Sequence, residues 1–302
     1  ESGSGKTTLL NCLSARLRPD GGRVLYNTRH QGMVDVWDDQ AGNRYARAIL
    51  PWHVRGSIQV GAGGVLRNQA GALLVFDQNT GISTHSGGRV RMRGWRASPV
   101  VLTADYPAVG WNGILLEGTP ASESYLTNAI VQHVRVDSTA VVARAGHTLV
   151  IDSTVFRQNG RAVALWSTDS RLSRSRVDTT RAANAPAVVL GSNALMESTL
   201  VRASSGEGVS VKNASVRIIS CEVRNSVEEG IILGVAAPVH NCNLVANGGV
   251  GIRNKDTATT AATDNNWWGD AGGPTAPGGD GVAGLQVYTP WFTTPYVLPY
   301  VP

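Results

Sequence analysis

Six consecutive residues near the start of the sequence have types and spacing suited to binding phosphate. They follow the pattern G-x-x-x-x-G-K-[ST] without its first glycine, and they are Gly3, Ser4, Gly5, Lys6, Thr7 and Thr8. In such a loop, backbone N–H groups cradle the phosphates and the lysine reaches the β- and γ-phosphates. The threonine after the lysine, here Thr7, ligates Mg²⁺. A helix is expected to follow, because Leu9, Leu10, Leu13 and Leu17 recur at helical spacing.

A second group of residues has the charge and spacing to bind anionic groups on a polymer. Three arginines alternate along a short segment, which places them on one face of a strand, and a fourth arginine and two tryptophans lie nearby. The group comprises Arg89, Arg91, Arg93, Arg96, Trp95 and Trp111. Guanidinium groups suit carboxylate, sulfate or phosphate, and the indole rings suit stacking on sugars or bases. The alternatives are a solvated arginine-rich face and tryptophans that pack in the interior or under loops.

No constellation of residues predicts catalysis or a resident metal ion. The six histidines are scattered without H-x-x-H or H-x₃-H spacing. Two pairs of acids, Asp152 with Asp178 and Glu228 with Glu229, would suit glycoside hydrolysis if they met on one face. A surface rich in charges offers such pairs by chance, so we predict no catalytic residues. Catalysis is therefore kept as an alternative function.

The elements that must position these side chains repeat along the chain. A small residue followed two places later by an aliphatic one recurs at steps of 22, 23, 23 and 21 residues. The pairs are Ser153/Val155, Ser175/Val177, Ser198/Leu200, Cys221/Val223 and Cys242/Leu244. A polar sixth copy, Asp264 to Asn266, follows. We interpret it as a terminal repeat on which nothing stacks.

The period is two within each segment and about 22 between segments, which leaves no room for a long helix. Each repeat is therefore two or three short strands, and stacked repeats bury a continuous core. The prediction is a solenoid of parallel strands, with right-handed winding. Alternation places the intervening residues Thr154, Arg176, Thr199, Glu222 and Asn243 on its outer face. The neighbouring copies containing Cys221 and Cys242 bring these two thiols within disulfide range, although stacked small core residues are the alternative.

The composition is compatible with a turn-rich β protein and with an anionic partner. The 302 residues include 35 glycines and carry a net charge of +5, and all but three of the 27 basic residues are arginine. A basic protein of this kind tolerates polyanions, but no specific nucleic-acid motif is present. No run of 18 apolar residues predicts a membrane span. The sequence shows neither an initiator methionine nor a signal region.

The first 27 residues resemble the start of an ABC-type ATPase. The stretch ESGSGKTTLLNCLSARLRPDGGRVLYN is most similar to the ATP-binding component of the carbon–phosphorus lyase system. The resemblance implies ATP and Mg²⁺ as ligands of Gly3 to Thr8 and a cytoplasmic location. The Q-loop, the LSGGQ signature, the Walker B acids and the switch histidine are missing from the sequence. The nearest Walker B match, Leu73 to Asp77, is interpreted as a solenoid strand.

Most of the remaining chain resembles right-handed parallel β-helix proteins of the pectin-lyase-like superfamily. The resemblance rests on Gly71 to Phe76, Ser98 to Thr103 and Gly110 to Ile114, and on a closing segment that begins with Asn265-Asn266-Trp267-Trp268. It is specific for the fold rather than for an activity. Residues Asp38-Asp39, Gly146-His147-Thr148 and Arg253-Asn254-Lys255 only partly match the motifs of the polygalacturonase type.

These observations predict an all-β protein, a right-handed single-stranded parallel β-helix preceded by a P-loop and helix fragment. The expected segments are the fragment at 1–33, a junction at 34–48, and the β-helix at 49–295 with its closing segment at 264–295. The expected function is non-catalytic binding of a polysaccharide or other polyanion outside the cytoplasm, with no cofactor. The alternatives are a polysaccharide lyase or hydrolase with an atypical site, and an ATP-binding subunit.

Overall fold

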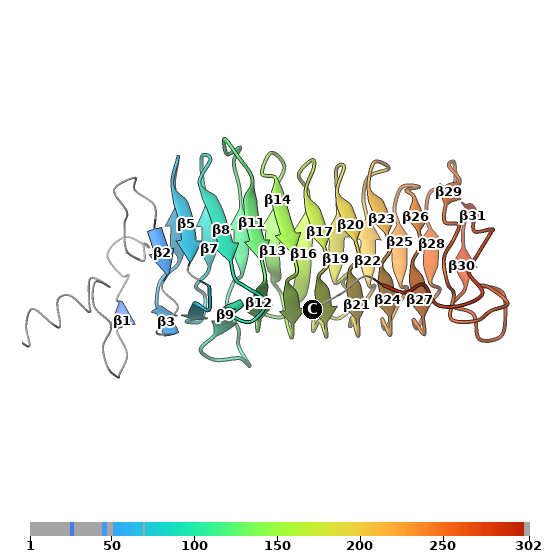
Figure 1. Ribbon diagram of the computed structural model, residues 1–302, viewed down its shortest axis with the longest axis horizontal. Coiled ribbons are helices and arrows are strands. Elements are labelled where there is room, and N and C mark those ends of the chain that lie inside the picture. The colour runs from blue at the N-terminus through green and yellow to red at the C-terminus, as the bar shows by residue number, and fades with distance from the viewer. Residues whose placement is uncertain (1–24, 27–43, 47–50, 69, 299–302) are drawn as a thin grey trace, which may run out of the picture.

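The computed structural model describes residues 25–26, 44–46, 51–68 and 70–298, and in them the chain is a parallel β-solenoid without helices. Strands from successive coils stack along one long axis and form three parallel sheets (Figure 1). The predicted fold class is therefore confirmed. Gly3 to Thr8 lie outside the described residues.

The strands are grouped here by sheet, because each coil contributes one strand to each sheet. One sheet contains β1 (Leu25–Tyr26), β3 (Pro51–Val54), β6 (Leu73–Phe76), β9 (Val100–Ala104), β12 (Ala129–Gln132), β15 (Val155–Arg157), β18 (Arg176–Asp178), β21 (Leu200–Arg202), β24 (Glu222–Arg224) and β27 (Asn243–Val245). We call it sheet A. Leu73 to Phe76 thus form a solenoid strand, as predicted.

Sheets B and C complete each coil. Sheet B contains β2 (Arg44–Ala46), β5 (Val65–Asn68), β8 (Arg89–Arg93), β11 (Ser124–Thr127), β14 (Leu149–Asp152), β17 (Arg171–Ser173), β20 (Leu195–Glu197), β23 (Arg217–Ile219) and β26 (Val239–His240). Sheet C contains β4 (Ile58–Val60), β7 (Ile82–Thr84), β10 (Ile114–Leu116), β13 (Thr139–Ala143), β16 (Arg161–Leu165), β19 (Val188–Leu190), β22 (Val209–Val211), β25 (Ile231–Leu233), β28 (Ile252–Asn254) and β30 (Val282–Ala283). A separate pair of strands, β29 (Ala261–Ala262) and β31 (Gln286–Val287), lies at the C-terminal end.

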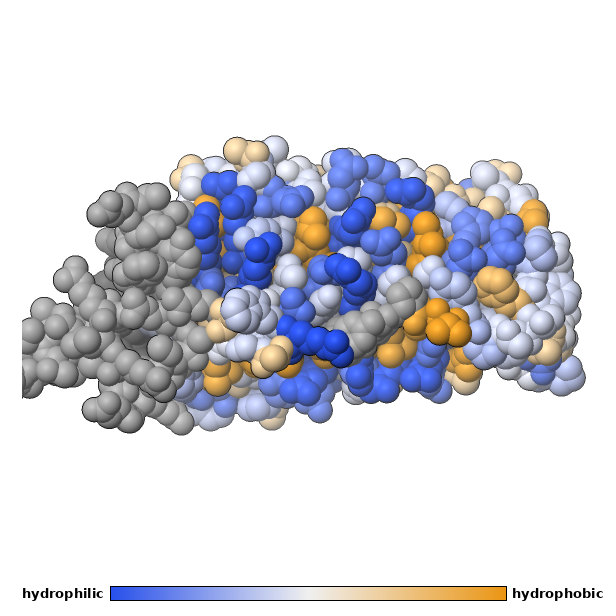
Figure 2. Space-filling model, viewed as in Figure 1, coloured by the Kyte–Doolittle hydropathy of each residue, from blue (hydrophilic) through white to orange (hydrophobic). Residues whose placement is uncertain are grey.

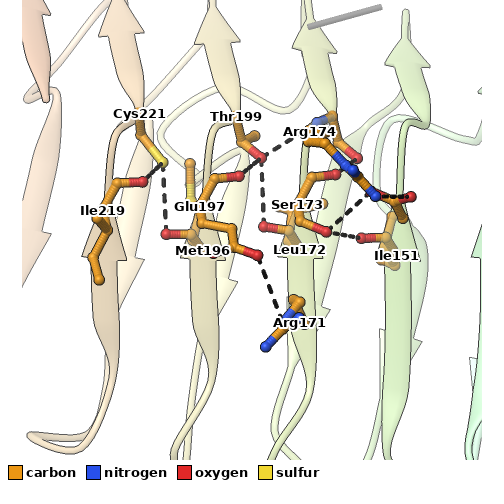
Figure 3. Close-up of polar contacts among 12 residues, drawn as sticks. Ile151, Arg171, Leu172, Ser173, Arg174, Met196, Glu197, Thr199, Ile219 and Cys221 are labelled. Atoms are coloured by element: carbon orange, nitrogen blue, oxygen red, sulfur yellow. Dashed lines mark hydrogen bonds and ion pairs between the residues drawn. The ribbon is translucent and has the colours of Figure 1, made fainter. Parts of the chain in front are cut away.

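The bend from sheet B to sheet A explains the column of small residues in the sequence. From β11 onward, one residue with positive φ makes this bend in each coil, for example Ser198 at 48° and Ser220 at 55°. The next side chain points inward and donates a hydrogen bond to the carbonyl two residues back. Thr199 Oγ1 donates to Glu197 O at 2.9 Å, and Cys221 Sγ donates to Ile219 O at 3.2 Å (Figure 3). The same carbonyls also accept a backbone N–H from the preceding coil, from Arg174 for Glu197 O and from Ser198 for Ile219 O, so the small side chain adds a second hydrogen bond at the bend.

Strand pairing places the inward column one residue away from its predicted position in two coils, those of β15 and β21. The fully buried residues after the bend are Thr154, Ser175, Thr199, Cys221, Cys242 and Asn266, and the next inward positions are Phe156, Val177, Val201, Val223 and Leu244. The prediction that Thr154 and Thr199 face outward is therefore wrong, and so is the inward assignment of Val155 and Leu200. A shift of one residue reverses the face of every side chain in a strand. Where serine is followed by threonine, either residue fits the small inward position, so the sequence does not show which of them faces the core.

Other parts of the predicted outer column are confirmed. Arg176 and Glu222 are only half-buried and alternate with inward residues. Asn243 shares their column but is buried, because the C-terminal tail covers it. The Asn243 side chain accepts from Tyr296 N–H at 2.8 Å and donates to Tyr296 O at 2.9 Å. Figure 1 shows this tail running back along the solenoid.

The last coil is also continuous with the core. Asn266 is fully buried, accepts from Cys242 N–H at 2.8 Å and donates to Val239 O at 2.9 Å. Trp268 is fully buried as well, whereas Trp267 is half-buried and pairs with Asn243. The copy predicted as Asp264 to Asn266 therefore aligns through Asn266 and Trp268, and it stacks on the coil before it. Cys221 and Cys242 are free, buried thiols, and burial raises the pKa of Cys221.

Candidate anion-binding site

The candidate site lies on the outer face of sheet B, where β8 passes between β5 and β11. Val90 and Met92 point into the core, so Arg89, Arg91 and Arg93 point outward on one face, as predicted. Figure 2 shows hydrophilic side chains gathered over β5 and β8 on the face in view. The alternation of β8 thus holds three guanidinium groups on one surface.

Two residues on the neighbouring coil arrange these arginines. Ser122 Oγ accepts from Arg89 Nη1 at 2.7 Å and from Arg91 Nη2 at 2.8 Å. Tyr125, which pairs with Arg91 in register, has its ring centroid 5.5 Å from Arg91 Cζ and 5.2 Å from Arg93 Cζ. Cation–π contacts of this length are attractive and orient the side chains. The three cations therefore converge on one serine and one tyrosine.

Among the described residues, the same three arginines have no acidic partner, whereas eight other arginines have one. Within the described ranges, no carboxylate lies within ion-pair distance of Arg89, Arg91 or Arg93; the paired arginines are Arg135, Arg144, Arg171, Arg174, Arg176, Arg202, Arg224 and Arg253. Glu123 is exposed and forms no ion pair with the row. No described carboxylate thus neutralises the positive charge of the β8 row, which favours an anion from solution.

The tryptophans and the fourth arginine fall in different environments. Trp95 is 69% exposed, and Arg96 beside it is exposed, at the end of β8. Trp111 is fully buried and stacks on Phe76 with ring centroids 4.1 Å apart. Trp111 therefore belongs to the core, and its indole N–H donates to Gln132 O at 2.9 Å. The prediction of Trp111 as a ligand platform is wrong, because a ring enclosed by core residues offers no face to a ligand.

The two acid pairs considered from the sequence differ in whether their members lie close together on one face. Asp152 lies in sheet B and is paired with Arg174 at 2.7 Å, whereas Asp178 lies in sheet A and is paired with Arg176 at 2.6 Å. These two acids are therefore on different faces. Glu228 and Glu229 are adjacent before β25. Burial and the neighbouring carboxylates of Glu207 and Glu229 raise the pKa of Glu228.

The pKa of Glu229 is moved in the opposite direction. Burial opposes its ionisation, but it is outweighed by several effects together: the hydrogen bond from Arg253 Nε at 2.6 Å, a backbone hydrogen bond, and the charges of Arg253 and Lys255. Their sum lowers the pKa. His147, from the partial polygalacturonase motif, is fully buried and bonds Ser124 Oγ at 2.7 Å, so it is enclosed in the core. In the part of the chain that is described, no cluster of three or more His, Cys, Asp or Glu residues is arranged to hold a metal ion.

Comparison with known families agrees with this architecture. The model of the right handed beta helix region matches residues 112–267, about half of the chain. The chain belongs to the right-handed β-helix family. Comparison of this β-helix protein with curated proteins and with solved structures gave no match. None of these findings supports the P-loop or ABC ATPase resemblance. The described residues of the β-helix protein include no helix long and apolar enough to cross a membrane.

Ser122 and Tyr125 were not predicted from the sequence of this β-helix protein. They lie more than 30 residues after their arginine partners, which exceeds the repeat length of the later coils. Only the pairing of β8 with β11 aligns Tyr125 with Arg91. The arginine row itself was visible because it lies within one strand.

Proposed function

We propose that this β-helix protein is a non-catalytic solenoid that binds an acidic polysaccharide outside the cytoplasm. The observation that supports it most directly is the row Arg89, Arg91 and Arg93, three convergent cations without carboxylate partners among the described residues. Clustered cations that lack counter-charges attract a polyanion and raise its association rate. The flat outer face of a solenoid is also long enough to meet several units of a polymer.

Replacing Arg91 with alanine is expected to weaken binding of the best acidic polysaccharide about tenfold, a change of about 1.4 kcal/mol in binding free energy. Arg91 contacts both Ser122 and Tyr125, so it is the centre of the row. The measurement is titration with dextran sulfate and polygalacturonate, with neutral dextran as the reference ligand.

Arg171→Ala provides the matched control. Arg171 projects from the same sheet and its loss changes the net charge equally, but it is paired with Glu197 at 3.7 Å. We expect Arg171→Ala to bind the polysaccharide with an affinity within about twofold of wild type. Arg171 is already held in an exposed ion pair and is not an unpaired cation, so its contribution to polyanion binding is small. Equal losses in both variants would show that only net charge matters and would contradict a specific site on β8.

A second candidate function, cleavage of a polysaccharide, is favoured by Glu228 and Glu229. Their pKa values are pushed apart, as in acid and base pairs of glycosidases. Under this candidate, Glu228→Gln is expected to abolish release of reducing or unsaturated sugar from an acidic polysaccharide, measured colorimetrically and by ultraviolet absorbance. Asp256→Asn, a change at a partly exposed acid outside this pair, is the control. No product from the wild-type protein over a panel of acidic polysaccharides would rule this candidate out.

Under the ATP-binding alternative, we propose ATP with Mg²⁺ as the ligand of Gly3 to Thr8. Under the leading proposal the β-helix itself needs no cofactor. Protection of the whole chain against thermal unfolding by Mg-ATP, lost in Lys6→Ala, is the result that would favour the ATP-binding alternative and a cytoplasmic location.

A further inference from the structure

The polar atoms that the β8 site offers are donors. Ser122 Oγ already accepts two guanidinium N–H groups, and its own hydroxyl proton is donated to none of the described residues. The Nε atoms of Arg89 and Arg91 have no acceptor among the described residues, but they are buried, so a ligand from solution meets the Nη atoms and the Ser122 hydroxyl instead. The site therefore favours a ligand that supplies several acceptor oxygens and no competing donor.

The arrangement of these donors does not suit a single planar carboxylate. A carboxylate is held best by two parallel N–H groups from one edge of one guanidinium. Nη2 of Arg91 donates to Ser122 Oγ and Nε of Arg91 is buried, so neither nitrogen of the edge that they form is free to bind a carboxylate. Arg89 uses Nη1 on Ser122 and also buries Nε, so each of its two edges has one engaged or buried nitrogen. Neither of these two arginines presents an open fork, so within the row only the exposed Arg93 is left to hold a carboxylate in this way.

A tetrahedral oxyanion fits the same geometry better. Its oxygens point in different directions and accept single bonds from several donors, as offered here by Arg89, Arg91, Arg93 and the Ser122 hydroxyl. We propose that the β8 site recognises sulfate esters on a polysaccharide, in preference to carboxylates. A phosphate monoester has the same shape but gains a proton below about pH 6, and this proton would face donors only. This inference rests on the proposed polysaccharide-binding function and specifies its ligand.

The test compares dextran sulfate, carboxymethyl dextran and phosphorylated dextran of equal length and substitution, so that the backbone and charge density are constant. Binding is measured at one ionic strength and at pH 5.5. We expect dextran sulfate to bind at least about tenfold more tightly than either of the other polymers. Ser122→Ala is expected to reduce this preference severalfold, whereas Arg171→Ala is expected to keep it. Unchanged far-ultraviolet circular dichroism would confirm that both variants fold.

The outcomes separate this inference from the function on which it rests. Equal affinity for dextran sulfate and carboxymethyl dextran, with both lost in Arg91→Ala, would overturn the sulfate preference and leave the polyanion-binding site standing. Equal affinity for the sulfated and phosphorylated polymers would overturn the selectivity for sulfate. Binding of none of the three polymers would overturn the proposed function itself. An unaltered preference in Ser122→Ala would refute the role of the serine and the site on β8.

Discussion

Phe156→Ala is expected to lower the free energy of unfolding by about 3–5 kcal/mol, the usual cost of deleting a buried phenylalanine ring. Phe156 is fully buried and lies on the inward face of β15, where its ring contributes to the continuous core. Val155→Ala, one residue away, is expected to cost less than about 1 kcal/mol, because Val155 lies on the outer face. Urea unfolding followed by circular dichroism measures both changes.

A second pair of variants tests the register in a strand where side-chain size alone would predict the opposite order of stability losses. In β21, Leu200 is the larger residue but faces outward, whereas the smaller Val201 is fully buried. Val201→Ala should therefore destabilise the protein more than Leu200→Ala. The reverse order in β21, or a larger loss from Val155→Ala than from Phe156→Ala, would mean that the strands are paired one residue away from the register described.

Raising the pH from 4 to 7 is expected to weaken the C-terminal cap through Asp280. This carboxyl is only 7% exposed, and burial raises its pKa from 3.8 to about 6, although the hydrogen bonds from Asn247 oppose the shift. Asn247 donates through its backbone N–H at 2.9 Å and through Nδ2 at 2.6 Å. A group with a raised pKa binds its proton more tightly in the folded state. Its contribution is complete below pH 3.8 and is lost as the pH rises through about 6, at a total cost of up to about 3 kcal/mol.

The measurement is the free energy of unfolding of wild type and Asp280→Asn at several pH values. Asparagine suits the position, because Asn247 itself accepts from Ser226 N–H in the preceding coil through its side-chain oxygen. The advantage of Asp280→Asn over wild type should grow from pH 4 to pH 7. His147 acts oppositely, since burial lowers its pKa and its contribution is lost as the pH falls below 6.5. His147 is present in both proteins, so the difference between them isolates Asp280. A constant difference across the range would show that Asp280 does not titrate in the cap.

The sequence was sufficient for much of the fold and for one part of the candidate site. The strand Leu73–Phe76 was predicted as part of the run Leu73 to Asp77, and the parallel solenoid from a period of about 22 residues. The outward row on β8 was predictable because its three arginines lie within one strand. The register was not, since Ser153-Thr154 and Ser198-Thr199 offer two adjacent small residues for one inward position. The bend decides between them, because each serine takes the positive φ of the bend and the threonine after it then points inward, where its hydroxyl donates to the carbonyl two residues back.

By itself, the sequence determined that this protein is a repeating all-β chain with an arginine-rich strand, since periodicity and charge alternation are local properties. Only the tertiary structure decided which arginines are neutralised. Arg171 is paired with Glu197, and Arg202 with Asp178, through contacts between neighbouring coils, whereas Arg91 is placed beside Tyr125 and Ser122. Partners in these contacts lie more than 20 residues apart in sequence, and the variable turn lengths shift their alignment. The chemistry of the outer face is therefore set by how the coils stack.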